Sequence, residues 1–390
     1  MPSVHDEFLQ RVARIAPLGV GLSVDVYSPN LFSLLASLYR RQAVPAYCEV
    51  FRAVPSALAA VRRHTECALT YHGEGLWVTQ PGGAQQEPFL REARAVAAQL
   101  SVLQSAWSNH ECASKYVEGY SFGTYLPPLY TPWSAAVVAA NIRVVQEVFD
   151  RECRLSDGGS PLFLLEMAPL TYFVAGTISI PSFFRRITES AACGLVLDIG
   201  HLWTVYRYSG AWRTQPLPQF VDRFLAEFPV ERVVEIHVAG LAVHEAMLES
   251  SKAAPLAAPD PLPLWTDAHM APIPPVLFDV LDQVLAHPRL VHLKGVALEV
   301  DTKPIDMIGD EFDMFRRRYA AAVPCRSRSA AFPHGEAGEC VEPNESVDLE
   351  AAHQAYERYA RVLTGGAVAE GPEWTAATAS ADGLAWYRET

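Results

Sequence analysis

An aspartate and a histidine stand one residue apart in the segment 264-LWTDAHMAPIP-274. In a strand or an extended loop, residues i and i+2 point to the same side, so Asp267 and His269 would face one point in space. A carboxylate and an imidazole that converge in this way suit a divalent metal ion. A single pair of this kind is more often the start of a helix, with Asp267 as the cap and His269 exposed. The metal interpretation therefore depends on further donors elsewhere in the chain.

Similar polar residues close several other apolar segments. The complete set of candidate metal ligands is His72, His110, Glu166, Asp198, His201, His237, Asp267, His269 and Glu299. Each one alone could be a buried polar side chain whose hydrogen bonds are satisfied. Four carboxylates gathered in an apolar environment, however, would repel one another and be costly to desolvate. Divalent cations offset that repulsion, so the set as a whole predicts a multinuclear metal site.

The donor types narrow the choice of metal. Histidine and carboxylate ligands without cysteine are typical of iron, manganese, zinc or cobalt, and they argue against copper(I) and iron–sulfur clusters. Donor types alone do not separate iron from zinc. With its cations bound, the site would also accept an anion such as a thiolate, a superoxide or a phosphate. No Ser/His/Asp or Cys/His triad stands out, so we expect no catalytic residues beyond the metal ligands.

To bring these donors together, the chain must alternate strands with helices. Near-continuous apolar runs predict buried strands at 18–24, 45–51, 67–73, 102–110, 161–167, 193–201, 232–240 and 290–301. Segments with helical periodicity follow them at 31–42, 55–64, 87–103, 133–153, 180–191, 217–228, 274–287 and 305–323. Such α/β units predict a parallel sheet closed into a (β/α)8 TIM barrel, whose strand carboxyl ends converge on one mouth. An open doubly wound sheet is the alternative, but no G-x-G-x-x-G follows the first strand.

The remaining segments are less regular. We expect the aromatic and proline-rich stretch 112–132 to be a loop that either covers a bound peptide or packs on its own side chains, and a second loop at 247–263. The composition becomes polar after residue 323. We therefore expect residues 1–323 to form the barrel and residues 324–390 to form a C-terminal extension, partly irregular, with one helix at 348–363. The extension would either dock a partner or be a tail.

Composition and charge exclude several classes of function. Half of the 390 residues (50%) are hydrophobic, which is enough for a large core. The formal charge is −13 and no block of Lys or Arg is visible, so neither nucleic acid nor a membrane is an expected partner. No signal peptide and no apolar run of about 18 residues is apparent, so the expected location is cytoplasmic. The seven cysteines are scattered and odd in number, which is typical of reduced thiols.

The order of the candidate ligands, and the sequence around them, resembles the multinuclear non-heme iron-dependent oxidative enzymes, which modify peptides in natural-product biosynthesis. The resemblance covers residues 18–310. It rests on 68-ALTYHGEGL-76, 108-SNH-110, 164-LLEMAPL-170, 193-CGLVLDIGHLW-203, 233-VVEIHVAG-240, 266-TDAHMAPIP-274 and 297-ALEVD-301. The endonuclease IV family of trinuclear zinc phosphodiesterases shares the ligand order but little of the surrounding sequence.

The resemblance implies three metal positions, two of which share one bridging ligand. One iron would bind His72, His110 and Glu166, a second would share Glu166 and add Asp198, His237 and Glu299, and a third would bind His201, Asp267 and His269. Glu235 would not be a ligand but would orient a ring nitrogen of a ligand histidine.

Two departures from the family pattern are visible. Many relatives carry a His-Pro-Glu-Asn-like segment after the second strand, where this chain has 49-EVFRAV-54. The resemblance therefore implies no role for that strand in substrate binding. Many relatives also carry Asn where this chain has His201, and a histidine there favours an occupied third site, as in the oxidase of methanobactin biosynthesis.

The implied cofactors are two to three iron ions in mixed Fe(II)/Fe(III) states, with O2 as co-substrate. The implied reaction is a two- or four-electron oxidation of a cysteine in a ribosomally made precursor peptide, which gives an oxazolone–thioamide pair or removes the cysteine β-carbon. A small partner protein would present the leader of the precursor. The alternatives are a trinuclear zinc phosphodiesterase of the endonuclease IV type, a metal-dependent sugar isomerase, and a non-catalytic partner-binding barrel. The acidic charge argues against DNA as a substrate.

Overall fold

The computed structural model describes residues 3–117, 120–169, 175–243, 265–267, 269, 271–301, 303–323 and 325. For residues 116–117, 120–124, 242–243 and 265–267 only the backbone is described. The chain divides into two units, residues 1–114 with 125–343, and residues 115–124 with 344–390. The first unit contains all of the candidate ligands.

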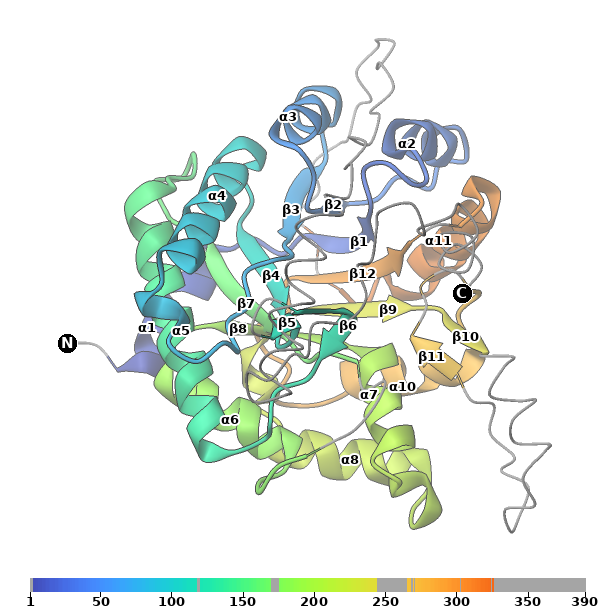
Figure 1. Ribbon diagram of the computed structural model, residues 1–390. Coiled ribbons are helices and arrows are strands. Elements are labelled where there is room, and N and C mark those ends of the chain that lie inside the picture. The colour runs from blue at the N-terminus through green and yellow to red at the C-terminus, as the bar shows by residue number, and fades with distance from the viewer. Residues whose placement is uncertain are drawn as a thin grey trace, which may run out of the picture. The chain divides into compact units, whose positions relative to one another are not determined.

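Eight parallel strands form a closed barrel in the first unit (Figure 1). Their order around the barrel is β1, β12, β9, β8, β7, β4, β3 and β2, and pairing of β2 with β1 closes the ring. The strands are β1 Gly19–Val24, β2 Tyr47–Phe51, β3 Ala68–His72, β4 Trp107–Glu111, β7 Leu162–Glu166, β8 Gly194–Asp198, β9 Val233–Ala239 and β12 Gly295–Val300. The predicted (β/α)8 barrel is confirmed, and each predicted strand overlaps one of these.

Helices surround the ring of strands in Figure 1. They are α1 Val4–Arg14, α2 Leu31–Arg40, α3 Pro55–His64, α4 Glu87–Leu103, α5 Pro132–Glu152, α6 Ile180–Ser190, α7 Ile199–Tyr208, α8 Leu217–Glu227, α10 Pro275–Leu285 and α11 Ile305–Tyr319. Short 3-10 helices lie at η1 Gly83–Gln85, η2 Ala211–Arg213 and η3 Val230–Arg232. The eight helices predicted between residues 31 and 323 are all present. The sequence analysis did not predict α1 or α7, and α7 occupies the end of the segment predicted as a strand at 193–201.

Local sequence signals determine where helices begin. Asn30, Thr131 and Ser179 cap α2, α5 and α6, because each side chain accepts a hydrogen bond from the backbone N–H three residues further on. The apolar faces of the helices then pack on the outward side of the strands. Phe149 of α5, for example, lies on Phe163 of β7 with ring centroids 6.4 Å apart. The strands are thus buried on both faces, which explains their continuous apolar sequences.

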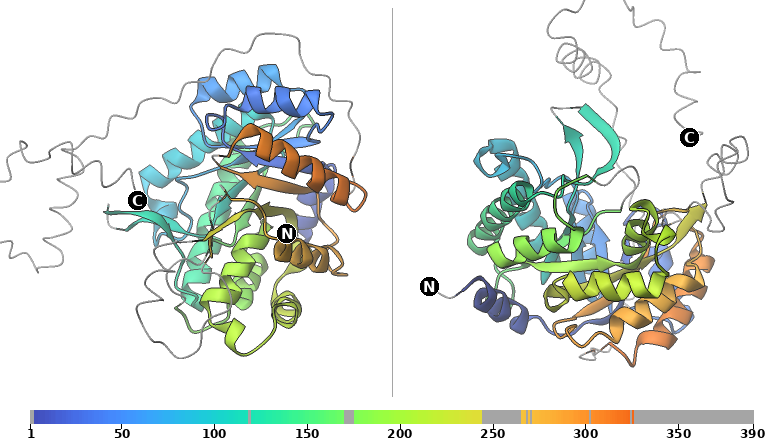
Figure 2. Two further views of the ribbon diagram at one scale, coloured as in Figure 1. Left: turned by 90° about the vertical axis from the view of Figure 1, so that its right-hand side faces the viewer. Right: turned by 90° about the horizontal axis from the view of Figure 1, so that it is seen from below.

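Helix α1 packs against the amino-terminal end of the barrel. Its Phe8 and Val12 are buried against Tyr47, Trp107 and Leu162, which are the first residues of β2, β4 and β7. Figure 2 shows this helix, next to the end marked N, on the outside of the strands. These apolar contacts cover the starts of β2, β4 and β7.

The ring of Tyr47 fills part of the barrel interior. A Cβ atom on Gly21 would lie 2.4 Å from the ring, and one on Gly295 would lie 2.5 Å from the hydroxyl oxygen. Both positions therefore require glycine. The Tyr47 hydroxyl donates a hydrogen bond to Glu235 Oε1 at 2.6 Å, which gives this buried carboxyl group a partner.

Two segments differ from the sequence-based expectation. The predicted loop 112–132 contains β5 (Ser114–Val117) and β6 (Tyr120–Leu126), which form a two-stranded sheet. Tyr130, one of the aromatic residues of this segment, is only 2% exposed and packs edge-on against Phe183, so it belongs to the core and is not available to cover a peptide. Strand β10 (Leu241–Val243) pairs antiparallel with β11 (Trp265–Asp267). The D-x-H segment therefore begins on a strand outside the barrel.

Several expectations concern residues that the structure does not describe. The predicted loop at 247–263 and the predicted helix at 348–363 lie outside the described residues. Cys325 is the one described residue of the 324–390 extension, so the division at residue 323 stays a prediction. The six described cysteines are free, as expected for reduced thiols. Within the described ranges, no helix combines the length and the apolar character needed to cross a membrane.

Candidate metal centre

The carboxyl ends of the barrel strands gather a buried group of ligand atoms. Every second side chain of a strand points into the barrel, and the register places Glu111 beside Glu166 and Asp198 beside His237. Glu166, Asp198, His237 and Glu299 each offer one ligand atom, and these four atoms all lie within 4.8 Å of one another. None of the four residues is more than 3% exposed. We call these four residues the carboxylate cluster.

Glu166 occupies the middle of the donor set. Its Oε2 accepts a hydrogen bond from Asn109 Nδ2 at 2.5 Å and lies 3.5 Å from His72 Nε2. Its Oε1 lies 3.4 Å from His201 Nδ1 and 3.7 Å from His237 Nδ1. One carboxylate thus approaches imidazoles from β3, α7 and β9. This geometry suits a ligand that is shared between metal ions.

His201 and His269 form a stacked pair, with ring centroids 6.4 Å apart. His201 lies in the first turn of α7, because Asp198 caps this helix by accepting the His201 backbone N–H at 2.7 Å. Nδ1 of His201 lies 2.7 Å from the Met167 carbonyl oxygen, which can only accept a hydrogen bond. Nδ1 therefore carries the proton, and Nε2 is the nitrogen able to bind a metal. The side chain of Asp267, the expected third ligand here, lies outside the described part of the chain.

The position of His269 is linked to the carboxylate cluster and to the segment that follows it. Its Nδ1 lies 3.7 Å from Glu299 Oε1. Further along, the backbone N–H of Ile273 donates to Glu311, and Glu311 pairs with the buried Lys303 at 2.9 Å. The hydrogen bond from Ile273 anchors the segment downstream of His269 to α11, and the ion pair with Lys303 holds the Glu311 side chain in place.

The structure does not bring His110 into the carboxylate cluster. Side chains alternate along β4, so Asn109 and Glu111 point into the barrel while His110 points outward and stacks on Phe163 at 5.6 Å. Burial and the charge of His72 lower the pKa of His110 to about 3, so this ring is neutral. Glu111 takes the inward position instead, 3.9 Å from His72 Nε2. A ligand role for His110 stays a prediction.

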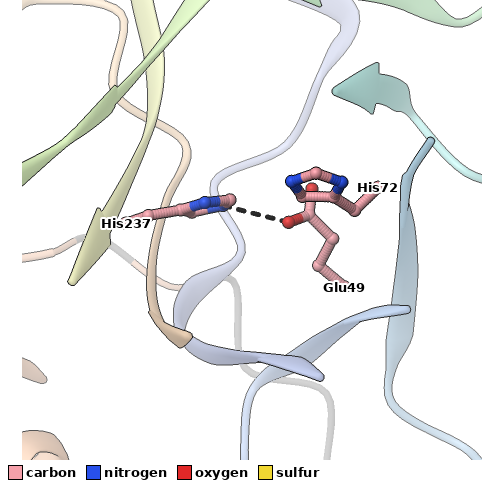
Figure 3. Close-up of side chains that lie close together, drawn as sticks. All are labelled: Glu49, His72 and His237. Atoms are coloured by element: carbon pink, nitrogen blue, oxygen red, sulfur yellow. Dashed lines mark ion pairs between the residues drawn. The ribbon is translucent and has the colours of Figure 1, made fainter. Parts of the chain in front are cut away.

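Glu49 is a candidate functional residue that the sequence analysis missed. It is fully buried on β2 and forms a second group with His72 and His237, whose ligand atoms lie within 4.8 Å of one another (Figure 3). Oε2 of Glu49 lies 3.0 Å from His237 Nε2. Alternation along β2 places Tyr47, Glu49 and Phe51 on one face. Glu49 lies in the middle of the strand, so a search restricted to residues at strand ends misses it.

The buried charges compensate one another. Burial alone would lower the pKa of His72, but Glu111 and Glu166 raise it to about 10. Burial also opposes protonation of His237, yet Glu49 and its neighbouring carboxylates hold the pKa of that ring well above its usual value. Burial would raise the pKa of Glu166, whereas His237 holds it well below its usual range. The protonated rings therefore act as counter-charges to the carboxylates.

The donor set also fits metal ions. Glu166 Oε1, Glu299 Oε2 and both ring nitrogens of His237 are buried, and none has an aligned hydrogen-bond partner among the described residues. Buried polar atoms are normally satisfied, so such a group requires an explanation. Burial raises the pKa of Glu111 and of Glu235 to about 7, which shows how crowded the carboxyl groups are. Divalent cations would satisfy these atoms and relieve the crowding.

A closed barrel whose strand ends enclose buried histidines and carboxylates defines a metal-binding (β/α)8 protein. The model of the family described as "RiPP precursor modification enzyme MbnB/TglH/ChrH" matches residues 17–317, and the chain belongs to this family. A RiPP is a ribosomally made peptide that is modified after translation. The match confirms the family resemblance expected from the sequence.

Individual relatives are distant. A UPF0276 protein of Caulobacter vibrioides is 26% identical over 263 residues, which are 67% of this chain and 79% of the relative. A UPF0276 protein of Rhizorhabdus wittichii is 27% identical over 221 residues, or 56% of this chain and 69% of the relative. The crystal structure of endonuclease IV from Thermus thermophilus is similar with a TM-score of 0.42 and 14% identity, and the similarity covers 78% of this chain and 98% of that chain.

Proposed function

We propose that this protein is a multinuclear non-heme iron oxidase that uses O2 to modify a cysteine of a ribosomally made precursor peptide. Membership of the family supports a precursor peptide as the substrate. The metal-dependent part of this proposal rests on the position of Glu166, whose carboxylate lies within 3.7 Å of the His72, His201 and His237 rings.

Two to three iron ions are the proposed cofactors. Glu166, Asp198, His237 and Glu299 would hold one ion, and His72 with Glu166 would hold a second, for which His110 and Glu111 are the candidate further ligands. A third ion would bind His201, Asp267 and His269. When bound, iron together with O2 supplies the oxidising power that removes two or four electrons from the cysteine.

The chain's own residues determine how a peptide reaches this centre. Helix α1 covers the starts of β2, β4 and β7, and the candidate ligands lie at the opposite ends of the strands, so the substrate thiol would approach from the carboxyl ends. Three donor side chains retain some exposure, His72 at 9%, Glu111 at 9% and His269 at 12%. The more deeply buried Glu166 and His237 hold the centre rigidly and exclude water. The proposed cysteine position is therefore beside His72 and His269.

The proposal is tested by supplying the iron-loaded protein with a cysteine-bearing precursor peptide encoded beside its gene, with and without any small partner protein encoded there. We expect O2 uptake and a mass change at the cysteine that corresponds to two- or four-electron oxidation or to loss of the β-carbon. A precursor with Cys→Ser is the matched control and should remain unmodified. An unchanged peptide and no O2 uptake by the iron-loaded protein, with the partner present, would contradict the proposal.

A further inference from the structure

The imidazole of His237 lies between two carboxylates. Glu299 Oε2 is 3.0 Å from Nδ1, and Glu49 Oε2 is 3.0 Å from Nε2. We propose that Glu49 is a positioning residue for the metal centre, which accepts the Nε2 proton of His237 and so directs Nδ1 to the metal. The inference rests on the proposed role of His237 as a ligand. It assigns to Glu49 a function that the sequence analysis had given to Glu235.

The surroundings of the two nitrogens differ, and this difference decides which one binds metal. Nδ1 faces the other members of the carboxylate cluster, Glu166, Asp198 and Glu299. Nε2 faces Glu49, whose Oε2 already accepts a hydrogen bond from Ser23 Oγ at 2.8 Å. A neutral imidazole binds metal through one nitrogen and keeps its proton on the other, where ligand histidines normally have a carboxylate or carbonyl acceptor. We therefore assign metal binding to Nδ1. Nε2, whose 3.0 Å contact with Glu49 Oε2 is not an aligned hydrogen bond in this structure, would donate its proton to Glu49 when the metal is bound.

Glu49 is a better acceptor for this proton than Glu235. Oε2 of Glu235 lies 3.7 Å from Nε2, beyond hydrogen-bond distance, and its Oε1 is bonded to Tyr47. Glu49, in contrast, is fixed from behind by Ser23, its register neighbour on β1. Both Ser23 and Glu49 are fully buried, so a water molecule from bulk solvent cannot readily replace the carboxylate. Figure 3 shows the Glu49 side chain directed from its strand toward His237 and His72.

Binding of Co2+ to the full-length metal-free protein tests this role, because affinity and the d–d absorption bands of the bound ion both report on the ligands. Loss of a carboxylate that orients a ligand histidine typically lowers metal affinity about 10–100-fold. We expect a loss of this size in Glu49→Ala, together with a shift of the absorption bands. Glu49→Gln, which keeps the shape, should give a smaller loss in the same direction, as should Ser23→Ala. Glu235→Gln is the matched control and should remain within about threefold of the wild type.

Three results would overturn the assignment. The first is unchanged Co2+ affinity and spectrum in Glu49→Ala and Glu49→Gln, provided that circular dichroism shows them folded. The second is an equal loss in Glu235→Gln, since any nearby carboxylate would then serve. The third is the disappearance of one whole Co2+ ion per chain in the Glu49 variants, which would make Glu49 a ligand. If the wild type itself binds no Co2+, the proposed function fails, and the inference fails with it.

Discussion

Replacement of Glu166 by Gln is the sharpest perturbation that the structure offers. The change keeps the size of the side chain and its contact with Asn109, but it removes the negative charge that lies among His72, His201 and His237. Because the proposed ions share this carboxylate, we expect Glu166→Gln to weaken binding of more than one ion. A residue that served one ion alone would affect a single binding step.

The size of the effect follows from burial. Glu166 is 0% exposed, so solvent does not screen its interactions. Removing one partner of a buried charge pair costs about 3–5 kcal/mol. At roughly 1.4 kcal/mol for each factor of ten, this corresponds to a loss of about 10²–10⁴-fold in metal affinity. Isothermal titration of metal-free protein with Fe2+ under anaerobic conditions measures the affinity and the number of ions together.

Asp150→Asn is the control variant for this experiment. Asp150 is a partly buried carboxylate that pairs with Arg11 at 2.7 Å, and it is not a member of the carboxylate cluster. It should bind the same number of ions as the wild type with the same affinity. Titration curves for Glu166→Gln that coincide with the wild-type curves would refute the bridging role of Glu166.

Three further predictions concern stability. Ligands that bind only the folded state stabilise it, so removal of bound metal with EDTA should lower the melting temperature. An unchanged melting temperature after verified metal removal would contradict a metal site. Burial raises the pKa of Asp150, but Arg11 and hydrogen bonds lower it overall. The ionised carboxyl group therefore stabilises the fold at a pH above its unfolded pKa, near 3.9. This stabilisation is lost as the pH falls through the lower pKa of the folded state. The gap in melting temperature between wild type and Asp150→Asn should therefore close on acidification, and a gap that widens would refute the assignment. A Cβ atom on Gly73 would lie 2.1 Å from His110 Cε1. Gly73→Ala should therefore lower the free energy of unfolding, measured in urea, by about 1–3 kcal/mol. A neutral effect would show that the His110 ring lies elsewhere.

Most of the barrel could be predicted from the sequence because its strands are buried on both faces and its helices carry an apolar stripe. Helix α7 could not be predicted, since it begins directly after Asp198 and the mostly apolar run 193–203 continues through the junction without a proline. A short apolar run does not distinguish strand from helix by periodicity. Helix α1 did carry a readable signal, a capping box between Ser3 and Asp6.

The candidate site was only partly accessible from the sequence. Strand-closing residues such as Glu166 and His237 could be proposed because the carboxyl ends of parallel strands meet at one mouth. The sequence did not show which of two adjacent strand residues points into the barrel, because a strand buried on both faces has no alternation of polar and apolar residues. This is why Glu111 was overlooked beside His110. Glu49 was overlooked because it lies deeper in the barrel than the residues that close the strands, and only the strand register shows this depth.

The central claim is that histidines and carboxylates from separate strands enclose two or three metal ions, and that these ions are iron. Elemental analysis of the aerobically purified full-length protein, combined with its near-UV and visible absorption spectrum, tests this claim most directly. The account predicts two to three iron ions per chain and an iron-dependent absorption that disappears with the metal. A protein that contains only zinc, or that binds no metal after reconstitution with iron, would contradict it.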